Sequence, residues 1–179
     1  MIYRKAVMAD IPAAHRLINE FADQGLMLRR PLMVLYESVR DLAVAVDEAG
    51  EVVGVGGLHI MWQDLAEIRS LAVDAKAAKK GIGRGIVEFL VGEARALGLK
   101  RVFALTYQQG FFEKCGFEVV PKETLPQKVW KECVYCDRFH CCDEIAMIRL
   151  LVPPEELKGE AGYEIPLVAK PDWSNQVKG

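Results

Sequence analysis

Apolar and polar residues along this chain follow two periods, one typical of strands and one typical of helices. Alternation with a period of two, or a short run rich in Val and Ile, indicates a strand, and apolar residues three and four positions apart indicate an amphipathic helix. We therefore expect strands at residues 2–7, 42–46, 51–62, 67–74, 100–106, 117–121 and 144–152. We expect helices over about residues 11–23, 31–42 and 83–96, with a short one starting at residue 109.

Turn residues mark where these elements begin and end. Asp10 precedes the first helix and is expected to be its N-cap. Gly25, Gly98 and Gly116 follow three of the helices, where a residue in the left-handed conformation commonly ends a helix. Strands dominate the middle of the chain and helices interrupt them, so the fold class is α/β with a mixed sheet.

Composition and charge narrow the class of protein. The chain has 179 residues, of which 51% are hydrophobic and 27% charged, with a formal net charge of −2. This balance gives no support for nucleic-acid binding. No apolar run approaches the roughly 18–20 residues of a membrane span, and the first 19 residues lack the apolar core of a signal peptide. We expect a cytoplasmic protein with small-molecule partners, and homo-oligomer formation is left open.

A glycine-rich loop lies between a predicted strand and a predicted helix. Residues 72–90 read AVDAKAAKKGIGRGIVEFL, with Gly81, Gly83 and Gly85 where the helix begins. Bare backbone N–H groups at a helix N-terminus suit a phosphate. The spacing fits neither a P-loop nor a dinucleotide-binding G-x-G-x-x-G. The alternative is a helix start with a structural role only.

This loop and its surroundings resemble the GNAT superfamily of N-acetyltransferases. The loop is similar to the superfamily's [QR]-x-x-G-x-[GA] pyrophosphate loop, with Ala78 in the first position, and FFEKCGF resembles its Y-E-K-x-G-F segment. The resemblance implies a centrally splayed mixed sheet flanked by helices, within residues 1–152, and residues 153–179 as a C-terminal extension. It also implies acetyl-CoA as co-substrate, bound by the strand end and the loop: Leu71, Ala72, Val73, Lys79, Lys80, Gly81, Ile82, Gly83 and Arg84. The alternative for Lys79 and Lys80 is that they are solvent-exposed loop residues without a role in binding.

A narrower resemblance concerns the acceptor. The segments FADQGLMLRR, GLHIMWQDLAEIRSLAVD, RVFALTYQQGFFEKCGF and ETLPQKVWKEC are similar to stand-alone N-acetylglutamate synthases, which acetylate the α-amine of L-glutamate in the first step of arginine biosynthesis. The resemblance implies that Arg30 holds a substrate carboxylate. Arginine suits this task because its guanidinium binds carboxylates through two hydrogen bonds. Further candidates for substrate binding are Arg29, Arg69, His59 and Lys131.

The chemistry of acetyl transfer requires a base, because an amine attacks a thioester only when it is neutral. Glu67 lies on the strand expected at residues 67–74, beside the point where the sheet is expected to splay. A period of two places Arg69 and Leu71 on the same face of this strand as Glu67. Apolar neighbours would make this carboxylate a better base. The alternative is a plain Glu67–Arg69 ion pair. Many members of the superfamily have a tyrosine that acts as the general acid at the position of Phe112. The resemblance therefore points to Thr106 as the general acid here, with Tyr107 as the second candidate.

The segment CVYCDRFHCC gathers thiols and an imidazole. Such spacing suits tetrahedral zinc, with Cys133, Cys136, Cys142 and either His140 or Cys141 as ligands. A reversible disulfide and buried thiols are the alternatives, and Cys115 is expected in the core.

The residues and resemblances described above together predict an N-acetyltransferase that acetylates glutamate by direct attack. The competing hypotheses are a GNAT enzyme for another small amine or a protein N-terminus, and a non-catalytic acyl-CoA sensor.

Overall fold

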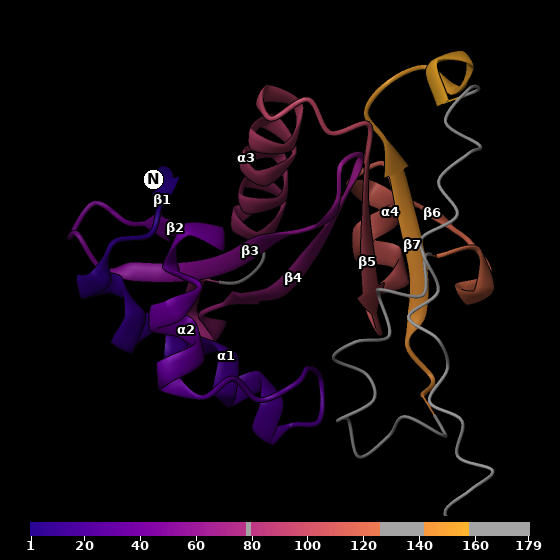
Figure 1. Cartoon of the computed structure of the whole chain (residues 1–179). Helices are drawn as coiled ribbons and strands as arrows, with labels where there is room; N and C mark the ends of the chain where they lie inside the picture. Colours follow the sequence, from indigo (N-terminus) through magenta and orange to yellow (C-terminus); the bar gives the residue numbers. More distant parts are fainter. Residues whose placement is uncertain (78–79, 126–141, 158–179) are drawn as a thin grey trace, which may run out of the picture.

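The fold is described from a computed structural model that covers residues 1–77, 80–125 and 142–157 (Figure 1). The strands are β1 (Ile2–Lys5), β2 (Leu42–Val46), β3 (Val52–Trp62), β4 (Leu65–Val73), β5 (Arg101–Thr106), β6 (Glu118–Val119) and β7 (Ile145–Leu150). The α-helices are α1 (Ile11–Asp23), α2 (Leu32–Glu37), α3 (Ile82–Ala96) and α4 (Gln109–Lys114). The predicted order of elements is confirmed, and the second helix is shorter than expected because a 3-10 turn replaces its end.

The described strands form one seven-stranded mixed sheet in the order β1-β2-β3-β4-β5-β7-β6. Strands β4 and β5 are its parallel pair, and the other neighbours are antiparallel. A parallel pair needs a crossover connection, and α3 supplies it between β4 and β5. The predicted α/β class with a mixed sheet is confirmed.

Helices cover both faces of the sheet near β3 and β4. Figure 1 shows α3 on one face and α1 with α2 on the other. The buried side chains separate accordingly into a cluster around α3, which includes Ile86 and Leu90, and a cluster around α1, which includes Leu17 and Ile18. Two buried faces explain why β2 is apolar at every position and shows no alternation.

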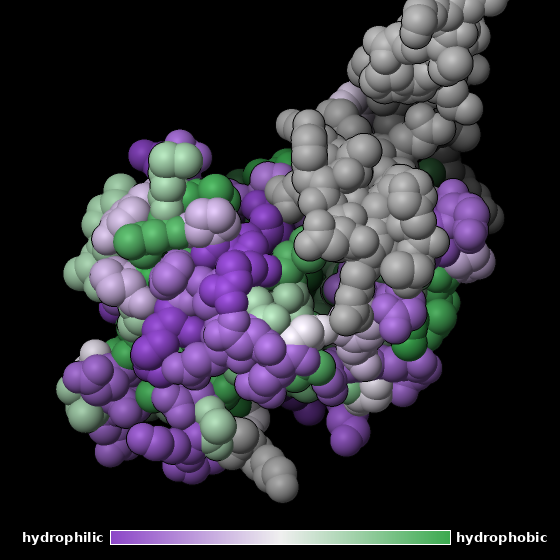
Figure 2. Space-filling view, turned by 90° about the horizontal axis from the view of Figure 1, so that it is seen from below, coloured by the Kyte–Doolittle hydropathy of each residue, from purple (hydrophilic) through white to green (hydrophobic). Residues whose placement is uncertain are grey.

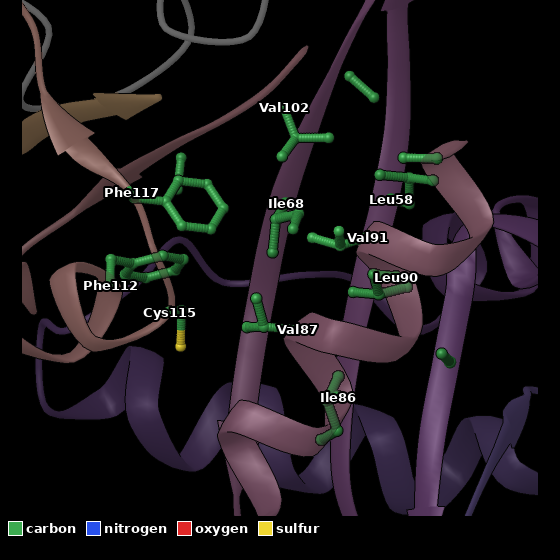
Figure 3. Packing of buried hydrophobic residues seen from close by; sticks show 14 of the residues in the cluster. Leu58, Ile68, Ile86, Val87, Leu90, Val91, Val102, Phe112, Cys115 and Phe117 are labelled. Carbon is green, nitrogen blue, oxygen red and sulfur yellow. The ribbon is translucent and has the colours of Figure 1, made fainter. Parts of the chain in front are cut away.

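The glycines of β3 allow α3 to lie directly on the strand. A Cβ atom at Gly54 would be 2.8 Å from Ile86 Cδ1, and one at Gly56 would be 2.7 Å from Ile86 Cγ2. Figure 3 shows Ile86, Val87, Leu90 and Val91 of α3 packed in the core that also holds Ile68 and Leu58. The glycines that weaken the strand pattern in the sequence therefore serve helix packing.

Asp10 occupies the predicted N-cap position of α1, but its side chain does not cap the helix. Its side chain makes no capping hydrogen bond to α1. Its Oδ2 instead accepts a hydrogen bond from the backbone N–H of Val7 at 2.8 Å, and the carboxylate forms a two-point ion pair with Arg4 at 2.6 and 2.9 Å. The pairing with Arg4 is the main reason that the pKa of Asp10 is lowered. Asp10 thus ties the start of α1 to β1.

None of the helices in the described ranges is both long enough and apolar enough to span a lipid bilayer.

Candidate active site

The central feature of the candidate site is the separation of β4 from β5. Their parallel pairing consists of Leu65 with Arg101, Ala66 with Val102 and Glu67 with Phe103. Beyond Glu67, β4 continues to Val73 and β5 to Thr106 without further pairing between them, and Figure 1 shows the two strands diverging. The sheet is therefore centrally splayed, as predicted.

A cavity of about 600 Å³ lies at this separation. Its lining combines β4, the glycine loop, the end of β5, α4 and the end of α1 with the residues after it. The described lining residues are Phe21, Leu26, Met27, Ile68, Arg69, Ser70, Leu71, Val73, Gly81, Ile82, Gly83, Arg84, Leu105, Thr106, Gln108, Phe111, Phe112, Lys114, Cys115 and Glu144. In Figure 2 pale green apolar side chains lie in a hollow bordered by purple hydrophilic ones. An elongated ligand with an apolar arm and an anionic end fits such a lining.

A β-bulge at Ser70 shapes the β4 wall of the cavity. Ser70 has φ 53°, and the pairing of β3 with β4 shifts by one residue between Gly57–Arg69 and Val55–Ala72. The left-handed conformation is strained for a serine, so the surrounding sheet must impose it. The extra residue reverses the alternation of side chains beyond this point.

The bulge overturns one prediction of the sequence analysis. We expected Leu71 on the face of Glu67 and Arg69, but it packs with Ile68 in the α3 cluster on the opposite face. Ala72 turns to the α1 cluster and is buried there. Leu71 and Val73 thus contribute side chains to the cavity, whereas Ala72 is not among its lining residues.

The three glycines of the loop have three different environments. Gly81 has φ 75° and is the N-cap of α3, and a Cβ atom there would meet nothing within 4 Å. A Cβ at Gly83 would lie 3.3 Å from the Phe111 ring, and one at Gly85 would lie 2.2 Å from the Tyr3 ring. Gly81 and Gly83 line the cavity, so the free N–H groups of the first turn of α3 lie beside it. Gly85 serves the packing of α3 against Tyr3.

The cations of the loop are also distinguished. Arg84 lines the cavity together with Ile82. Lys80 is exposed and is not among the lining residues, and Lys79 lies outside the described residues. Arg84 is therefore the described cation of this loop that can reach a phosphate bound at the N-terminus of α3.

Glu67 belongs to a charged cluster on one face of β3 and β4. Arg69 lies 3.9 Å from Glu67 Oε2 and 3.9 Å from Asp41 Oδ2, and His59 Nδ1 lies 2.8 Å from the same Asp41 oxygen. Glu67 and His59 are direct partners in the β3–β4 register. The side chain of Arg69 is only 12% exposed and that of Glu67 19%, so solvent screens these charges weakly. His59 and Arg69, both predicted substrate ligands, are thus engaged with carboxylates of the protein.

Thr106 is the buried polar residue at the end of β5. It is 8% exposed, lines the cavity and accepts a hydrogen bond at Oγ1 from the backbone N–H of Gln108 at 2.9 Å. This contact leaves the hydroxyl hydrogen free to be donated elsewhere. Tyr107, the second predicted acid, is not among the cavity-lining residues.

The segment between α1 and α2 carries the predicted acceptor ligand. Leu26 and Met27 of this segment line the cavity, whereas Arg30, three residues after Met27, is not among the lining residues. The peptide groups of Arg30 are hydrogen-bonded to the side chain of Asn19 on α1, at 3.0 Å in both directions. Arg29 forms an exposed ion pair with Asp23. Both arginines are recognisable in the sequence, but Asn19 is not, because an asparagine inside a helix pattern gives no signal of a distant partner.

The comparisons with known proteins agree with this geometry. The family profile described as "Acetyltransferase (GNAT) family" matches residues 13–117, more than half of the chain. The chain belongs to this family. It is 40% identical over 148 residues to an uncharacterized N-acetyltransferase of Chlorobaculum tepidum, covering 83% of this chain and 95% of that protein. It is also 40% identical over 133 residues to an amino-acid acetyltransferase of Mycobacterium tuberculosis, covering 73% of this chain and 76% of that protein.

Solved structures show the same likeness. A Mycobacterium tuberculosis protein in complex with CoA and a ligand designated NLQ has a TM-score of 0.75 and 35% identity, covering 85% of this chain and 100% of the other. The N-acetylglutamate synthase of Neisseria gonorrhoeae, complexed with coenzyme A and N-acetyl-glutamate, has a TM-score of 0.76 and 27% identity. The match covers 85% of this chain and 35% of that longer one. This GNAT protein is accordingly an acetyl-CoA-dependent N-acetyltransferase.

Two cysteines of this GNAT chain, Cys115 and Cys142, lie within the described residues, and the other three do not. Cys115 is buried as predicted, and burial raises the pKa of its thiol, which makes it a poor nucleophile. The zinc candidates Cys133, Cys136, His140 and Cys141 lie outside the described residues, as does the substrate candidate Lys131. Across residues 1–77, 80–125 and 142–157, no three His, Cys, Asp or Glu side chains are grouped to hold a metal ion. The zinc site stays a prediction.

Cys142 and Glu144 form a further polar group at the cavity edge that the sequence analysis did not connect. Lys122 Nζ donates to the carbonyl of Cys142 at 2.9 Å and lies 3.5 Å from its sulfur, while Cys142 Sγ lies 3.9 Å from Glu144 Oε2. Burial raises the pKa of Glu144, which lines the cavity, and the charge of Lys122 opposes this shift. Lys122 and Cys142 are 20 residues apart, so no local pattern in the sequence could have shown the group.

Proposed function

We propose that the protein transfers the acetyl group of acetyl-CoA to the α-amine of L-glutamate, giving N-acetyl-L-glutamate and coenzyme A. The observation that carries the proposal is the cavity at the β4–β5 separation, which joins the N-terminus of α3 to the segment that leads to Arg30. The amino-acid acetyltransferase of Mycobacterium tuberculosis and the N-acetylglutamate synthase of Neisseria gonorrhoeae support an amino-acid acceptor. Acetylation of glutamate would serve arginine biosynthesis.

The donor half of the site is built largely from backbone. We assign the pyrophosphate of acetyl-CoA to the free N–H groups at Gly81–Gly83 and the charge of Arg84, because helix N-termini bind anions. The apolar side chains Leu71 and Val73 would line the pantetheine arm along β4. This assignment directs the thioester toward the point where β4 and β5 separate.

We assign the proton transfers to Glu67 and Thr106. Glu67 takes the proton of the substrate ammonium, and the free amine forms a C–N bond with the thioester carbonyl carbon. The C–S bond then breaks, and the hydroxyl of Thr106 donates a proton to the departing thiolate. The second proton lost by the attacking nitrogen restores the Thr106 hydroxyl, which leaves a neutral amide. The hydrogen bond from Gln108 N–H to Thr106 Oγ1 supports this role, because it stabilises negative charge on that oxygen. Direct attack uses no covalent intermediate, which agrees with a buried, poorly nucleophilic Cys115.

We assign one carboxylate of glutamate to the guanidinium of Arg30. His59 and Arg69 are weaker candidates because Asp41 and Glu67 already lie against them. Two carboxylates, Asp41 and Glu67, lie in this cluster, and they attract an ammonium group and repel a further carboxylate. The cluster is thus suited to the amine end of the substrate.

The first test is turnover of acetyl-CoA with a panel of free amino acids and polyamines, measured by mass spectrometry of the acetylated product. We expect L-glutamate to be acetylated with the highest kcat/KM. Preferred acetylation of glutamine or another amino acid would replace the acceptor and keep the enzyme class. Acetylation of polyamines alone would contradict a carboxylate-binding site.

The carboxylate assignment has its own test in two neighbouring arginines. Arg30→Ala should raise the KM for glutamate by about 10-fold or more, because a charge-assisted two-point contact is lost. Arg29→Ala removes the same charge one residue away, from an exposed ion pair with Asp23, and should change that KM by less than about threefold. Equal effects of the two variants would show a general charge effect and contradict the assignment.

A further inference from the structure

Asn19 is an unusual residue for its position. It lies in the interior of α1 and is only 6% exposed, among the apolar residues of the α1 cluster. Asparagine is a poor helix former, and a buried amide is unfavourable unless it is hydrogen-bonded. Neither helix formation nor apolar packing therefore explains an asparagine at this position.

The amide of Asn19 is satisfied by one residue eleven positions away. Its Nδ2 donates to the carbonyl oxygen of Arg30 at 3.0 Å, and its Oδ1 accepts from the N–H of Arg30 at 3.0 Å. The side chain thus pairs with Arg30 as a neighbouring strand would. Two hydrogen bonds to the same residue fix both its distance from α1 and its orientation.

Two other contacts of the segment between α1 and α2 lie away from the peptide groups of Arg30. The Arg29–Asp23 ion pair is more than 60% exposed on both sides, and exposed pairs of long side chains constrain a loop weakly. Leu26 bonds back to Phe21 at the beginning of the segment, four residues before Arg30. The Asn19 contact is part-buried and lies at Arg30 itself.

We propose that Asn19 is a positioning residue of the acceptor site, which orients Arg30 toward the carboxylate of the incoming amino acid. This inference rests on the proposed function, in which Arg30 holds that carboxylate. A guanidinium binds a carboxylate through two hydrogen bonds only when the two planes are aligned. A displacement of about 1 Å in a positioning group can reduce activity by up to about 100-fold. Asn19 contributes to acceptor binding although it is not among the residues that line the cavity.

The decisive variant is Asn19→Leu, which is similar in size and removes both hydrogen bonds. We expect the KM for glutamate to rise about 10-fold, with the KM for acetyl-CoA and kcat each within about threefold of wild type. A general loss of structure would instead affect all three parameters. An equal rise of both KM values would overturn the proposal.

A double-mutant cycle tests whether Asn19 acts through Arg30. In the Arg30→Ala background, Asn19→Leu should raise the KM for glutamate no further, because the side chain that it positions is absent. Multiplicative effects of the two substitutions would show independent actions and overturn the proposal. If Arg30→Ala alone leaves that KM unchanged, the proposed carboxylate assignment fails. If Arg30→Ala raises it and Asn19→Leu does not, only the positioning role fails.

Two further variants control for folding. Ile11→Ala creates a cavity at the far end of the same helix, and should lower the melting temperature while leaving the KM for glutamate within twofold. If Asn19→Leu does not fold, Asn19→Asp keeps an oxygen that accepts from Arg30 N–H and loses the donor to the Arg30 carbonyl. It should raise the KM for glutamate, and an unchanged value would overturn the proposal.

Discussion

The two ends of the cavity are built in different ways. At the proposed donor end, Gly81 and the first turn of α3 present backbone groups, and residues that are neighbours in the sequence supply them. At the proposed acceptor end, Arg30 is held by Asn19 of α1, and Arg69 of β4 lies between Glu67 and Asp41, which precedes β2. The donor end depends on local conformation, whereas the acceptor end depends on contacts between separate elements. Changes at the donor end should therefore affect acetyl-CoA alone, and changes at the acceptor end should affect catalysis or the amino acid.

The largest effect should come from Glu67→Gln at the acceptor end. Removing a general base commonly lowers a rate by about 10²–10⁴-fold, and we expect a fall of this size in kcat. The KM for acetyl-CoA should change by less than about threefold, since the donor end is unaltered. Steady-state kinetics measure both values. Glu118→Gln, the same change at an exposed position of β6, should leave kcat unaltered. A fall of less than about 10-fold for Glu67→Gln would remove Glu67 as the base.

Two glycines provide the next test, because they separate ligand binding from packing. Gly81→Ala places a side chain in open space but forces φ 75° on an alanine, at a cost of about 1–2 kcal/mol. The altered loop should raise the KM for acetyl-CoA by about 10-fold and leave that for glutamate within twofold.

Gly85→Ala is the matched control for that loop. Its Cβ atom would lie 2.2 Å from the Tyr3 ring, so the substitution should destabilise the fold by about 1–3 kcal/mol through overpacking. Thermal unfolding should therefore show a lower melting temperature, with a smaller change in the KM for acetyl-CoA than Gly81→Ala causes. A larger rise in the KM for acetyl-CoA from Gly85→Ala than from Gly81→Ala would contradict a donor site at Gly81.

The smallest effect concerns the start of α1, the helix that carries Asn19. The Arg4 pairing lowers the pKa of Asp10, so Asp10 adds stability that is present above the unfolded value of about 3.9 and is lost as the pH falls through the folded value. Because Arg4 is 39% exposed and screened by solvent, we expect Asp10→Asn to cost only about 1 kcal/mol at pH 7. Urea unfolding should show this difference from wild type shrinking below about pH 4. A difference that does not depend on pH would contradict the ion-pair explanation.

Much of the local structure could be predicted from the sequence. The bounds of α1 agree with the apolar period, and Gly98 and Gly116 have the positive φ values expected of residues that end helices. The glycine loop was also predictable, because Gly81 has a conformation that other residues rarely adopt. These features depend on neighbouring residues and are visible in a short window.

Other features could not be predicted in the same way. A period of two placed Leu71 with Glu67, and the bulge at Ser70 reversed it, although serine gives no sign of a left-handed conformation. Aspartate is a residue type that commonly caps helices, but the side chain of Asp10 pairs with Arg4. Asn19 had no visible role until its partner eleven residues away was located. Each outcome was decided by a competing partner that the local pattern does not contain.

The sequence by itself determined the elements, their order, the loop before α3 and, through family resemblance, the N-acetyltransferase class. Only the tertiary structure decided that β4 and β5 part after Glu67, that Arg69 lies between two carboxylates, and that Asn19 holds Arg30. The physical reason is the range of the interactions. Backbone conformation and amphipathic period act within a few residues, whereas burial and pairing of polar groups join residues that come together only when the sheet and helices pack.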